Sequence, residues 1–156
     1  MVELLKTITF TAVLMLSATT GPALAQSAER DFAAEEANRE LVIEFYNRFF
    51  IEHDISAADV VAEDYIQHNP RLPDGKDTLV SFFSGFFKEN PEWRERIIRS
   101  GTDGDLVFLQ VHATNGPNDR GQAIMEIFRV EDGKIAEHWD VVQDVPETAE
   151  NDNTMF

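Results

Sequence analysis

A histidine and an aspartate stand two residues apart in a short strand-like segment, as His138 and Asp140 of the run Ile135–Asp140. A turn sequence, Glu131–Lys134, precedes this run. Because residues i and i+2 of a strand point to the same face, the imidazole and the carboxylate are predicted to project together. On a mostly buried sheet such a pair is costly unless it is hydrogen-bonded or used in chemistry. These two residues are therefore the first candidates for a functional role.

Asp140 is predicted to act as a general base. A carboxylate that apolar walls partly remove from water has a raised pKa and becomes a useful base near neutral pH. His138 could orient Asp140, protonate a leaving oxygen or polarise a carbonyl group. The alternatives are an Asp140 that faces solvent or makes a structural hydrogen bond, and a His138 that is a hydrogen-bonded structural residue.

Two further pairs of polar side chains lie near predicted strand ends. His68 and Asn69 end a short extended segment at a proline, where pocket rims occur and where the Asn69 amide could bond a carbonyl group. Gln110 and His112 share a face near the end of a later strand, which indicates the mouth of a cavity. The competing interpretations are an exposed His68 with a turn-capping Asn69, and a surface position for His112.

The facing of Glu126 depends on the turn at Asp132–Gly133. A two-residue loop pairs Glu126 with Trp139 and places it opposite the face of the histidine and aspartate. A three-residue loop with Gly133 as a bulge pairs Glu126 with His138 and brings both acids into one pocket. An Asp-Gly sequence fits either turn, so both alternatives stay open.

A metal site is the other chemical alternative. His138 and Asp140, with His68 or His112, would supply two imidazoles and a carboxylate. This spacing is common by chance, and no metal is predicted. The sequence contains no Cys, which excludes disulfides, thiolate metal sites and a Cys nucleophile. It also lacks a Ser-centred nucleophile motif, a phosphate loop and a dinucleotide fingerprint.

Helices are predicted in the first half of the chain. From about residue 34 to residue 53, large apolar residues recur every four positions, which is typical of an amphipathic helix with a broad aromatic stripe. His53 at its end is predicted to be a helix C-terminal cation. Ser56 could cap a short helix that ends at Ala62. A third helix is predicted over Asp77–Glu89, before the break at Asn90–Pro91.

After Trp93 the apolar pattern changes to a period of two residues. Short turns separate four predicted strands, Trp93–Ser100, Leu106–Ala113, Gln122–Val130 and Ile135–Asp144. Short connections predict an antiparallel meander, and helices followed by strands favour the α+β class. A strongly curved sheet with helices on its concave side would enclose an apolar pocket, with Tyr46 and Phe86 among its lining residues.

The first 25 residues are predicted to be an export signal. An apolar stretch at residues 8–16 is too short for a spanning helix, which needs about 20 apolar residues, and Ala23–Leu24–Ala25 resembles a cleavage signal. Cleavage after Ala25 would leave 131 of the 156 residues. The mature chain keeps the net charge of −16, because residues 1–25 hold one Glu and one Lys. That charge opposes binding to nucleic acids and anionic membranes.

Four segments are expected along the chain. Residues 1–25 form the signal, residues 26–34 a polar lead-in, residues 35–146 one folded domain and residues 147–156 an acidic tail. The final Met155–Phe156 could dock on an apolar surface of the domain.

Several motifs resemble those of the SnoaL-like polyketide cyclase branch of the nuclear transport factor 2-like superfamily, in particular of SnoaL-like aldol-condensation proteins. The resemblance covers about residues 35–156. The motifs that carry it are Tyr65–Pro70, Glu126–Ile135, Glu137–Gln143 and Asn153–Phe156.

This resemblance implies a cone-shaped α+β barrel with three helices, commonly a dimer. It also implies that Asp140 is the base of an aldol-type closure without metal or organic cofactor, and that His68 and His112 are pocket partners. The known cyclases work in the cytoplasm, whereas this chain has a predicted export signal. The reaction class is expected to be the same, but a polyketide substrate is not expected.

The sequence therefore predicts an exported protein, periplasmic or secreted, that performs cofactor-independent acid/base chemistry on a small apolar carbonyl compound. The reaction would be an aldol-type condensation, a cyclisation or an isomerisation. The alternative is a non-enzymatic module that binds a small ligand. A homodimer is expected through the convex sheet face, with Trp139 and Val141 as contacts. No nucleic-acid partner is expected, and no membrane contact after cleavage.

Overall fold

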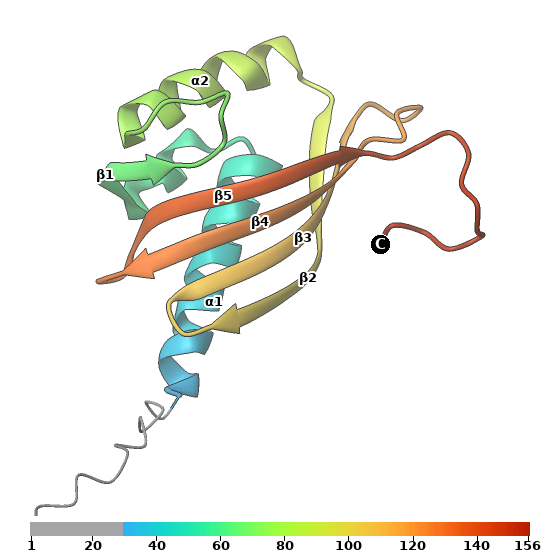
Figure 1. Cartoon of the computed structure of the whole chain (residues 1–156). Helices are drawn as coiled ribbons and strands as arrows, with labels where there is room; N and C mark the ends of the chain where they lie inside the picture. The colour runs from blue at the N-terminus through green and yellow to red at the C-terminus, as the bar shows by residue number, and fades with distance from the viewer. Residues whose placement is uncertain (1–29) are drawn as a thin grey trace, which may run out of the picture.

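A computed structural model describes residues 30–156, so the predicted export signal and its cleavage point at Ala25 lie outside the described residues. Two helical segments with short irregular helices come first, and a long meander of strands follows (Figure 1). In this part of the chain no helix is long and apolar enough to cross a lipid bilayer. The elements are α1 (Phe32–Tyr46), η1 (Asn47–Ile51), η2 (Ile55–Val60), β1 (Val61–Gln67), α2 (Lys76–Glu89), β2 (Trp93–Asp103), β3 (Leu106–Asn115), β4 (Gln122–Glu131) and β5 (Lys134–Asp144).

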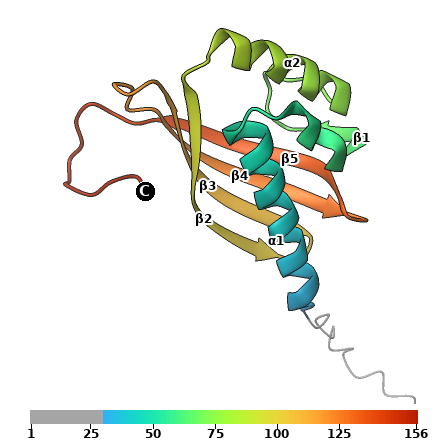
Figure 2. The ribbon, with the colours of Figure 1, turned by 180° about the vertical axis from the view of Figure 1, so that it is seen from behind.

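The five strands form one open, curved sheet in the order β1-β5-β4-β3-β2. Strands β2 to β5 are an antiparallel meander, as predicted, and the short β1 pairs in parallel with β5 at the edge. Helix α1 crosses the concave face of the sheet, and α2 lies over the end of the sheet near β1 (Figure 2). The α+β prediction is confirmed, with an unclosed sheet in place of a barrel.

Helix α1 begins two residues before the predicted start and continues directly into the π-helical turn η1. The Asp31 side chain caps it by accepting hydrogen bonds from the backbone N–H groups of Ala33 and Ala34. The stripe on its inner face buries Phe45 and Phe49 at 3% and 0% exposure. This burial is the main reason for its position, because packing of an apolar face stabilises a helix more than propensity does.

His53 does not act as the predicted cation at a helix end. Its backbone has a left-handed φ of 59°, which ends the helical path. Its ring stacks on Phe87 with centroids 4.0 Å apart. Burial lowers the pKa of His53, and the positive charge of Arg94 lowers it further. The neutral ring therefore packs as an aromatic side chain.

The predicted second helix is a 3₁₀ helix whose cap differs from the prediction. Asp54, two residues before Ser56, accepts a hydrogen bond from the Ser56 backbone N–H and another from its hydroxyl. Asp54 also pairs with Arg48 at 2.7 Å. Asp54 rather than Ser56 is therefore the N-cap of this helix, because its carboxylate accepts from a free N–H group of the first turn.

The β4–β5 hairpin decides which side chains reach the concave face. Its turn is the two-residue loop Asp132–Gly133, with φ values of 49° and 71°, and Glu131 pairs with Lys134. A bulge in β5 then shifts the register by one residue, so that Glu126 pairs with Asp140. Both predicted registers are therefore wrong. Glu126 nevertheless shares the face of His138 and Asp140, as the second alternative predicted. The bulge causes this, because a shift of one residue reverses the facing that a two-residue loop alone would give.

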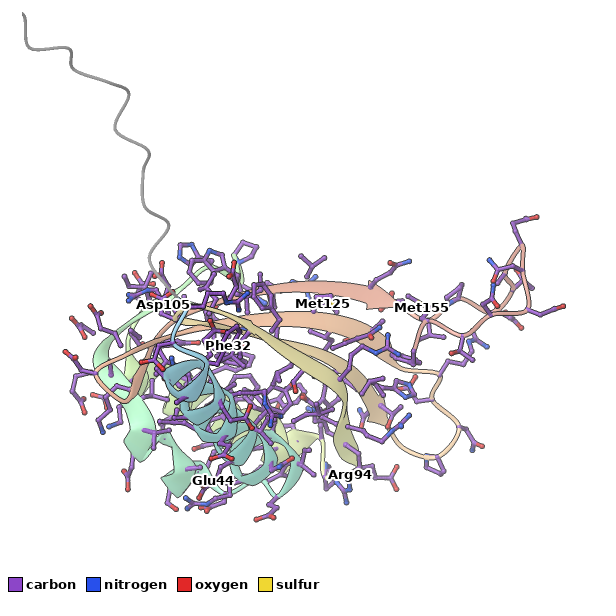
Figure 3. All side chains as sticks on the ribbon, turned by 90° about the horizontal axis from the view of Figure 1, so that it is seen from below. Phe32, Glu44, Arg94, Asp105, Met125 and Met155 are labelled. Carbon is purple, nitrogen blue, oxygen red and sulfur yellow. The ribbon has the colours of Figure 1, made fainter. Side chains whose placement is uncertain are left out.

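The C-terminal segment returns to the outer face of the sheet. The Gln110 side chain donates a hydrogen bond of 2.7 Å to the Met155 carbonyl, and the Phe156 ring lies 4.2 Å from the His112 ring. Figure 3 shows Met125 on the face turned away from α1 and Met155 at the far end of the sheet. Met155–Phe156 therefore contacts the sheet, but through Gln110 and His112 and not on the predicted apolar surface.

Candidate functional site

A cavity of about 180 Å³ lies between the helices and the concave face of β4 and β5. Its helix side is apolar and its sheet side carries most of the polar groups. The lining residues are Phe45, Phe50, Tyr65, Gln67, Asn69, Arg71, Leu72, Leu79, Phe82, Phe83, Phe86, Trp93, Glu95, Gln122, Ile124, Glu126, Phe128, His138, Asp140 and Val142. A small pocket with apolar walls and a few polar groups is typical of a small-molecule site.

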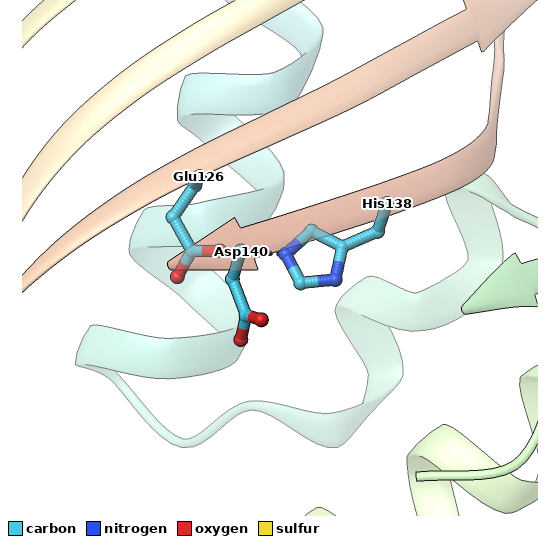
Figure 4. Close-up of side chains that lie close together, drawn as sticks. All are labelled: Glu126, His138 and Asp140. Carbon is cyan, nitrogen blue, oxygen red and sulfur yellow. Dashed lines mark hydrogen bonds and ion pairs between the residues drawn. The ribbon is translucent and has the colours of Figure 1, made fainter. Parts of the chain in front are cut away.

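Glu126, His138 and Asp140 gather on the concave face of adjacent strands (Figure 4). One ligand-type atom of each residue lies within 4.8 Å of the others. Asn69 holds Asp140 in place, because its side-chain amide donates a 2.6 Å hydrogen bond to Asp140 Oδ2. Among the described residues Oδ1 of Asp140 has no hydrogen-bond donor, which leaves it available to a ligand.

The protonation of His138 follows from its two partners. The backbone N–H of Asn69 donates to Gln67 Oε1 at 2.9 Å and fixes the orientation of that amide. His138 Nδ1 lies 2.9 Å from the same oxygen, so Nδ1 carries a proton and donates it. His138 Nε2 lies 2.6 Å from Glu126 Oε2. One proton is therefore shared between Nε2 and the Glu126 carboxyl group.

A second buried carboxyl group, that of Glu95, also lines the cavity. Glu95 is 8% exposed and accepts a 2.8 Å hydrogen bond from the Trp93 indole N–H. The Tyr46 hydroxyl bonds to Glu95 and, at 3.0 Å, to Glu126. Burial raises the pKa of Glu95 to about 8, and the nearby charge of Glu126 contributes to this shift. Glu95 is therefore protonated at neutral pH.

Tyr65 offers the cavity a hydroxyl group whose proton is free. Its oxygen accepts a 3.3 Å hydrogen bond from the Gln67 side chain, and no described residue accepts the Tyr65 proton. Burial raises the pKa of Tyr65 well above its ordinary value, with the charges of Glu126 and Asp140 adding to the effect. The hydroxyl therefore stays protonated and can donate to an oxygen of a bound ligand.

His68 does not lie in the pocket, in contrast to the prediction. It projects from the outer face, where Nε2 lies 2.7 Å from Glu137 Oε1 and the ring stacks on Trp139 at 4.5 Å. Alternation beyond Gln67 explains this, because neighbouring residues in an extended segment point to opposite sides. Its neighbour Asn69 points into the cavity, as predicted.

Gln110 and His112 do not lie in the pocket either. The buried residues of β3 are Val107, Leu109, Val111 and Ala113, so the two polar residues between them face outward under the C-terminal segment. The shared face of Gln110 and His112 was predicted well, but the sequence did not show that this face is the convex one.

The remaining pocket predictions divide into residues at the wall and behind it. Phe86 and Glu126 line the cavity. Tyr46 is fully buried behind the wall and reaches the cavity through Glu126. Sequence reasoning missed Tyr65, Gln67 and Glu95. Tyr65 was noted only as part of the motif Tyr65–Pro70, for its resemblance to the family. The alternation Tyr65-x-Gln67 would have indicated the first two, and the buried strand position of Glu95 carried no comparable signal.

The predicted metal set does not assemble, because His68 and His112 are on the outer face. Within residues 30–156, Glu126, His138 and Asp140 are the one cluster whose spacing would suit a cation. Both nitrogens of His138 are occupied by Gln67 and Glu126. A metal could bind His138 only after one of these bonds breaks, so this donor set does not fit a resident metal well.

The family model of the SnoaL-like domain matches residues 42–138, which is more than half of the chain. The chain therefore belongs to the SnoaL-like family. No curated protein matches it.

Solved structures share the fold at low sequence identity. A candidate ketosteroid isomerase from Kribbella flavida is 20% identical, with a TM-score of 0.61, and the match covers 75% of this chain and 85% of that one. A nuclear transport factor 2-like protein of unknown function from Mesorhizobium loti is 23% identical, with a TM-score of 0.58 and coverage of 70% and 93%. A candidate polyketide cyclase from Acidithiobacillus ferrooxidans is 14% identical, with a TM-score of 0.57 and coverage of 68% and 87%.

The raised pKa of Glu95 predicts a pH dependence of stability. The folded protein keeps a proton up to a pKa of about 8, whereas the ordinary value is 4.5. The contribution of this group to the free energy of unfolding is therefore complete below pH 4.5 and is lost as the pH rises toward 8, by no more than about 5 kcal/mol. In Glu95→Gln, whose amide resembles the protonated acid, this loss should be absent in urea unfolding across that range.

The control is Glu92→Gln, which makes the same change at an exposed position and should keep the pH dependence of the unmodified protein. Parallel curves for the unmodified protein and Glu95→Gln would contradict a proton held on Glu95.

Proposed function

We propose that this SnoaL-like protein abstracts a proton next to the carbonyl group of a small apolar compound, with Asp140 as the base and without a cofactor. The reaction class is an aldol-type condensation or cyclisation, or an isomerisation through an enolate. The single observation that carries the proposal is the setting of Asp140, which Asn69 orients through one oxygen while the other is free at the apolar cavity.

The neighbours of Asp140 supply the second requirement, a group that stabilises negative charge on the ligand oxygen. The free proton of the Tyr65 hydroxyl is suited to this role, and it lines the same cavity. A donor already in place when charge develops stabilises the transition state more than water would. His138 adds positive charge when it holds both of its protons. It replaces His68 and His112, the other two histidines predicted for this role.

The proposed steps are short. Asp140 Oδ1 takes the proton from the carbon next to the carbonyl group, and the negative charge moves to the carbonyl oxygen. Tyr65 donates a hydrogen bond to that oxygen. In a condensation the enolate then attacks a second carbonyl carbon of the ligand, and the oxygen of that carbonyl takes the proton back from Asp140. In an isomerisation Asp140 returns the proton at another carbon. The Phe-rich helix side holds the apolar part of the ligand and excludes water.

Replacement of the base is the direct test. Asp140→Asn keeps the shape of the side chain and removes the proton acceptor, so kcat should fall by about 10²–10⁴-fold while the fold persists. The measurement is turnover of any carbonyl compound found in a condensation and isomerisation screen. Asp144→Asn makes the same change farther along β5, at an exposed residue outside the cavity, and should leave kcat unchanged. An unchanged kcat in Asp140→Asn would show that Asp140 has a structural role.

A non-enzymatic binding module is the second candidate function. The observation that favours it is the saturation of His138, whose nitrogens are both engaged by protein groups. In that case a ligand would protect the fold, its affinity would be the same in Asp140→Asn, and the screen would yield no turnover.

We also propose a homodimer through the outer face of the sheet. Val141 is 71% exposed and Met125 is 45% exposed on this face, and Trp139 is only partly covered by His68. Such exposed apolar side chains are typical of interfaces. Val141→Glu should shift the protein from dimer to monomer in sedimentation, whereas Ser81→Glu on the exposed side of α2 should not. A monomer at micromolar concentration before any substitution would contradict the proposal.

Export remains a proposal based on the first 25 residues. N-terminal sequencing of the mature protein should give Gln26 as the first residue, and a cytoplasmic protein that starts at Met1 would contradict it.

A further inference from the structure

Four side chains form an unbroken row of hydrogen bonds along the wall of the cavity: Glu95, Tyr46, Glu126 and His138. Of these only Tyr46 does not line the cavity. We call this row the buried chain. It runs from β2 through α1 to β4 and β5, and it joins residues up to 80 positions apart in the sequence. Each member is less than 9% exposed, and Tyr46 is fully buried. The mechanism proposed above uses only its last member, so the rest of the buried chain has no role yet.

At neutral pH the two carboxyl groups of the buried chain would ordinarily both be deprotonated. The hydrogen bonds of the buried chain require one proton more than that. Tyr46 has one hydroxyl proton but bonds to carboxyl oxygens on both sides. Because two oxygens need a proton between them to form a hydrogen bond, one of the two carboxyl groups must supply the other. Glu126 already faces the proton that it shares with His138. The extra proton therefore belongs to Glu95, which donates it to the Tyr46 oxygen.

We propose that the buried chain is a proton relay, in which Glu95 stores a proton and passes it through Tyr46 to Glu126 when negative charge develops in the cavity. The proposal rests on the proposed function, because it is the enolate that would supply this charge. It assigns Glu95 and Tyr46 as positioning residues that act through Glu126 and His138, and not through contact with the reacting atoms.

The transfer balances without any other reactant. The O–H bond of Glu95 breaks as its proton moves to the Tyr46 oxygen, and the original Tyr46 proton moves to Glu126 Oε1. Tyr46 ends with one proton, as it began. The negative charge moves from Glu126 to Glu95, and the total charge of the buried chain stays the same.

The surroundings of Glu95 make this transfer possible. Tyr46 from α1 and Glu126 from β4 face it, and Trp93 on its own strand donates to Oε1. No Lys, Arg or His of the described residues forms an ion pair with Glu95. Without a cation paired to it, Glu95 is not held permanently in the charged form. The Trp93 hydrogen bond still stabilises the carboxylate once it forms on Glu95.

The consequence for the site is a change of the charge beside His138. Before the transfer the negative charge is on Glu126, 2.6 Å from His138 Nε2. After the transfer it is on Glu95, farther along the buried chain. An enolate oxygen would promote this shift, because two negative charges repel each other strongly in a buried, apolar setting. The relay therefore moves negative charge away from the ligand as the ligand becomes negative.

Infrared spectroscopy of the intact protein tests the relay without a substrate. At pH 7 the unmodified protein should show the carbonyl stretch of a protonated, buried carboxylic acid, and this band should disappear near pH 8. Labelling with ¹³C-glutamate should shift the band, which separates it from Asp140. Glu95→Gln should lack the band. Its amide can bond to Tyr46 and Trp93 as the protonated acid does, so this variant is expected to fold.

Coupling along the buried chain is tested by the ¹⁵N resonances of His138. In the unmodified protein these resonances should move with the same midpoint as the infrared band, because loss of the Glu95 proton redistributes charge up to Glu126. In Tyr46→Phe the chain is interrupted, and this movement should vanish while the acid band remains. Absence of a glutamic acid band at pH 7, or a band that persists in Glu95→Gln, would overturn the proposal. So would His138 resonances in Tyr46→Phe that still follow the unmodified curve. None of these outcomes depends on whether Asp140 catalyses a reaction.

Discussion

The burial of carboxyl groups beneath a layer of aromatic rings is the constraint on which the rest of this structure depends. An unpaired charge in such a place costs several kcal/mol, so each buried acid needs hydrogen bonds or a proton. Glu126 meets this requirement with Tyr46 and His138, and Glu95 meets it with Trp93, Tyr46 and a proton. These bonds require that α1, β2, β4 and β5 keep fixed positions relative to one another. The polar network thus specifies the arrangement of elements that the Phe-rich core alone would leave free to vary.

The division of the sheet into two faces separates two kinds of chemistry. The concave face holds groups that are short of water and therefore reactive, whereas the convex face holds screened pairs such as Glu137 with Arg129 at 2.7 Å. Hydrogen bonds from Arg129 and His68 lower the pKa of Glu137, so it stays charged and inert as a base. Asp140 lies one strand position beyond Trp139 and has the opposite environment. A carboxylate is thus structural on one face and a candidate base on the other.

The sequence was sufficient for the class of fold and for the four-stranded meander, but not for the parallel pairing of β1 with β5. Periods of four and two residues gave the helices, the meander and the common face of His138 and Asp140, because these depend on local alternation. The placement of His68, Gln110 and His112 could not be obtained in this way, since alternation gives two faces but not which face is concave. The facing of Glu126 depended on a bulge in β5, and no residue type marks that bulge. The Glu95–Tyr46–Glu126 contacts join distant segments, and single-sequence patterns carry no signal for them.

The proposed function requires that the cavity removes a proton from the carbon next to a carbonyl group, and isotope exchange measures this step alone. In D₂O, a panel of small apolar ketones and aldehydes would be incubated with the protein and followed by proton NMR. We expect that compounds which shift the resonances of Tyr65 and His138 also lose their α-proton signal faster than in buffer. The proposed function would be wrong if every compound of the panel that shifts these resonances exchanged its α-proton no faster than in buffer.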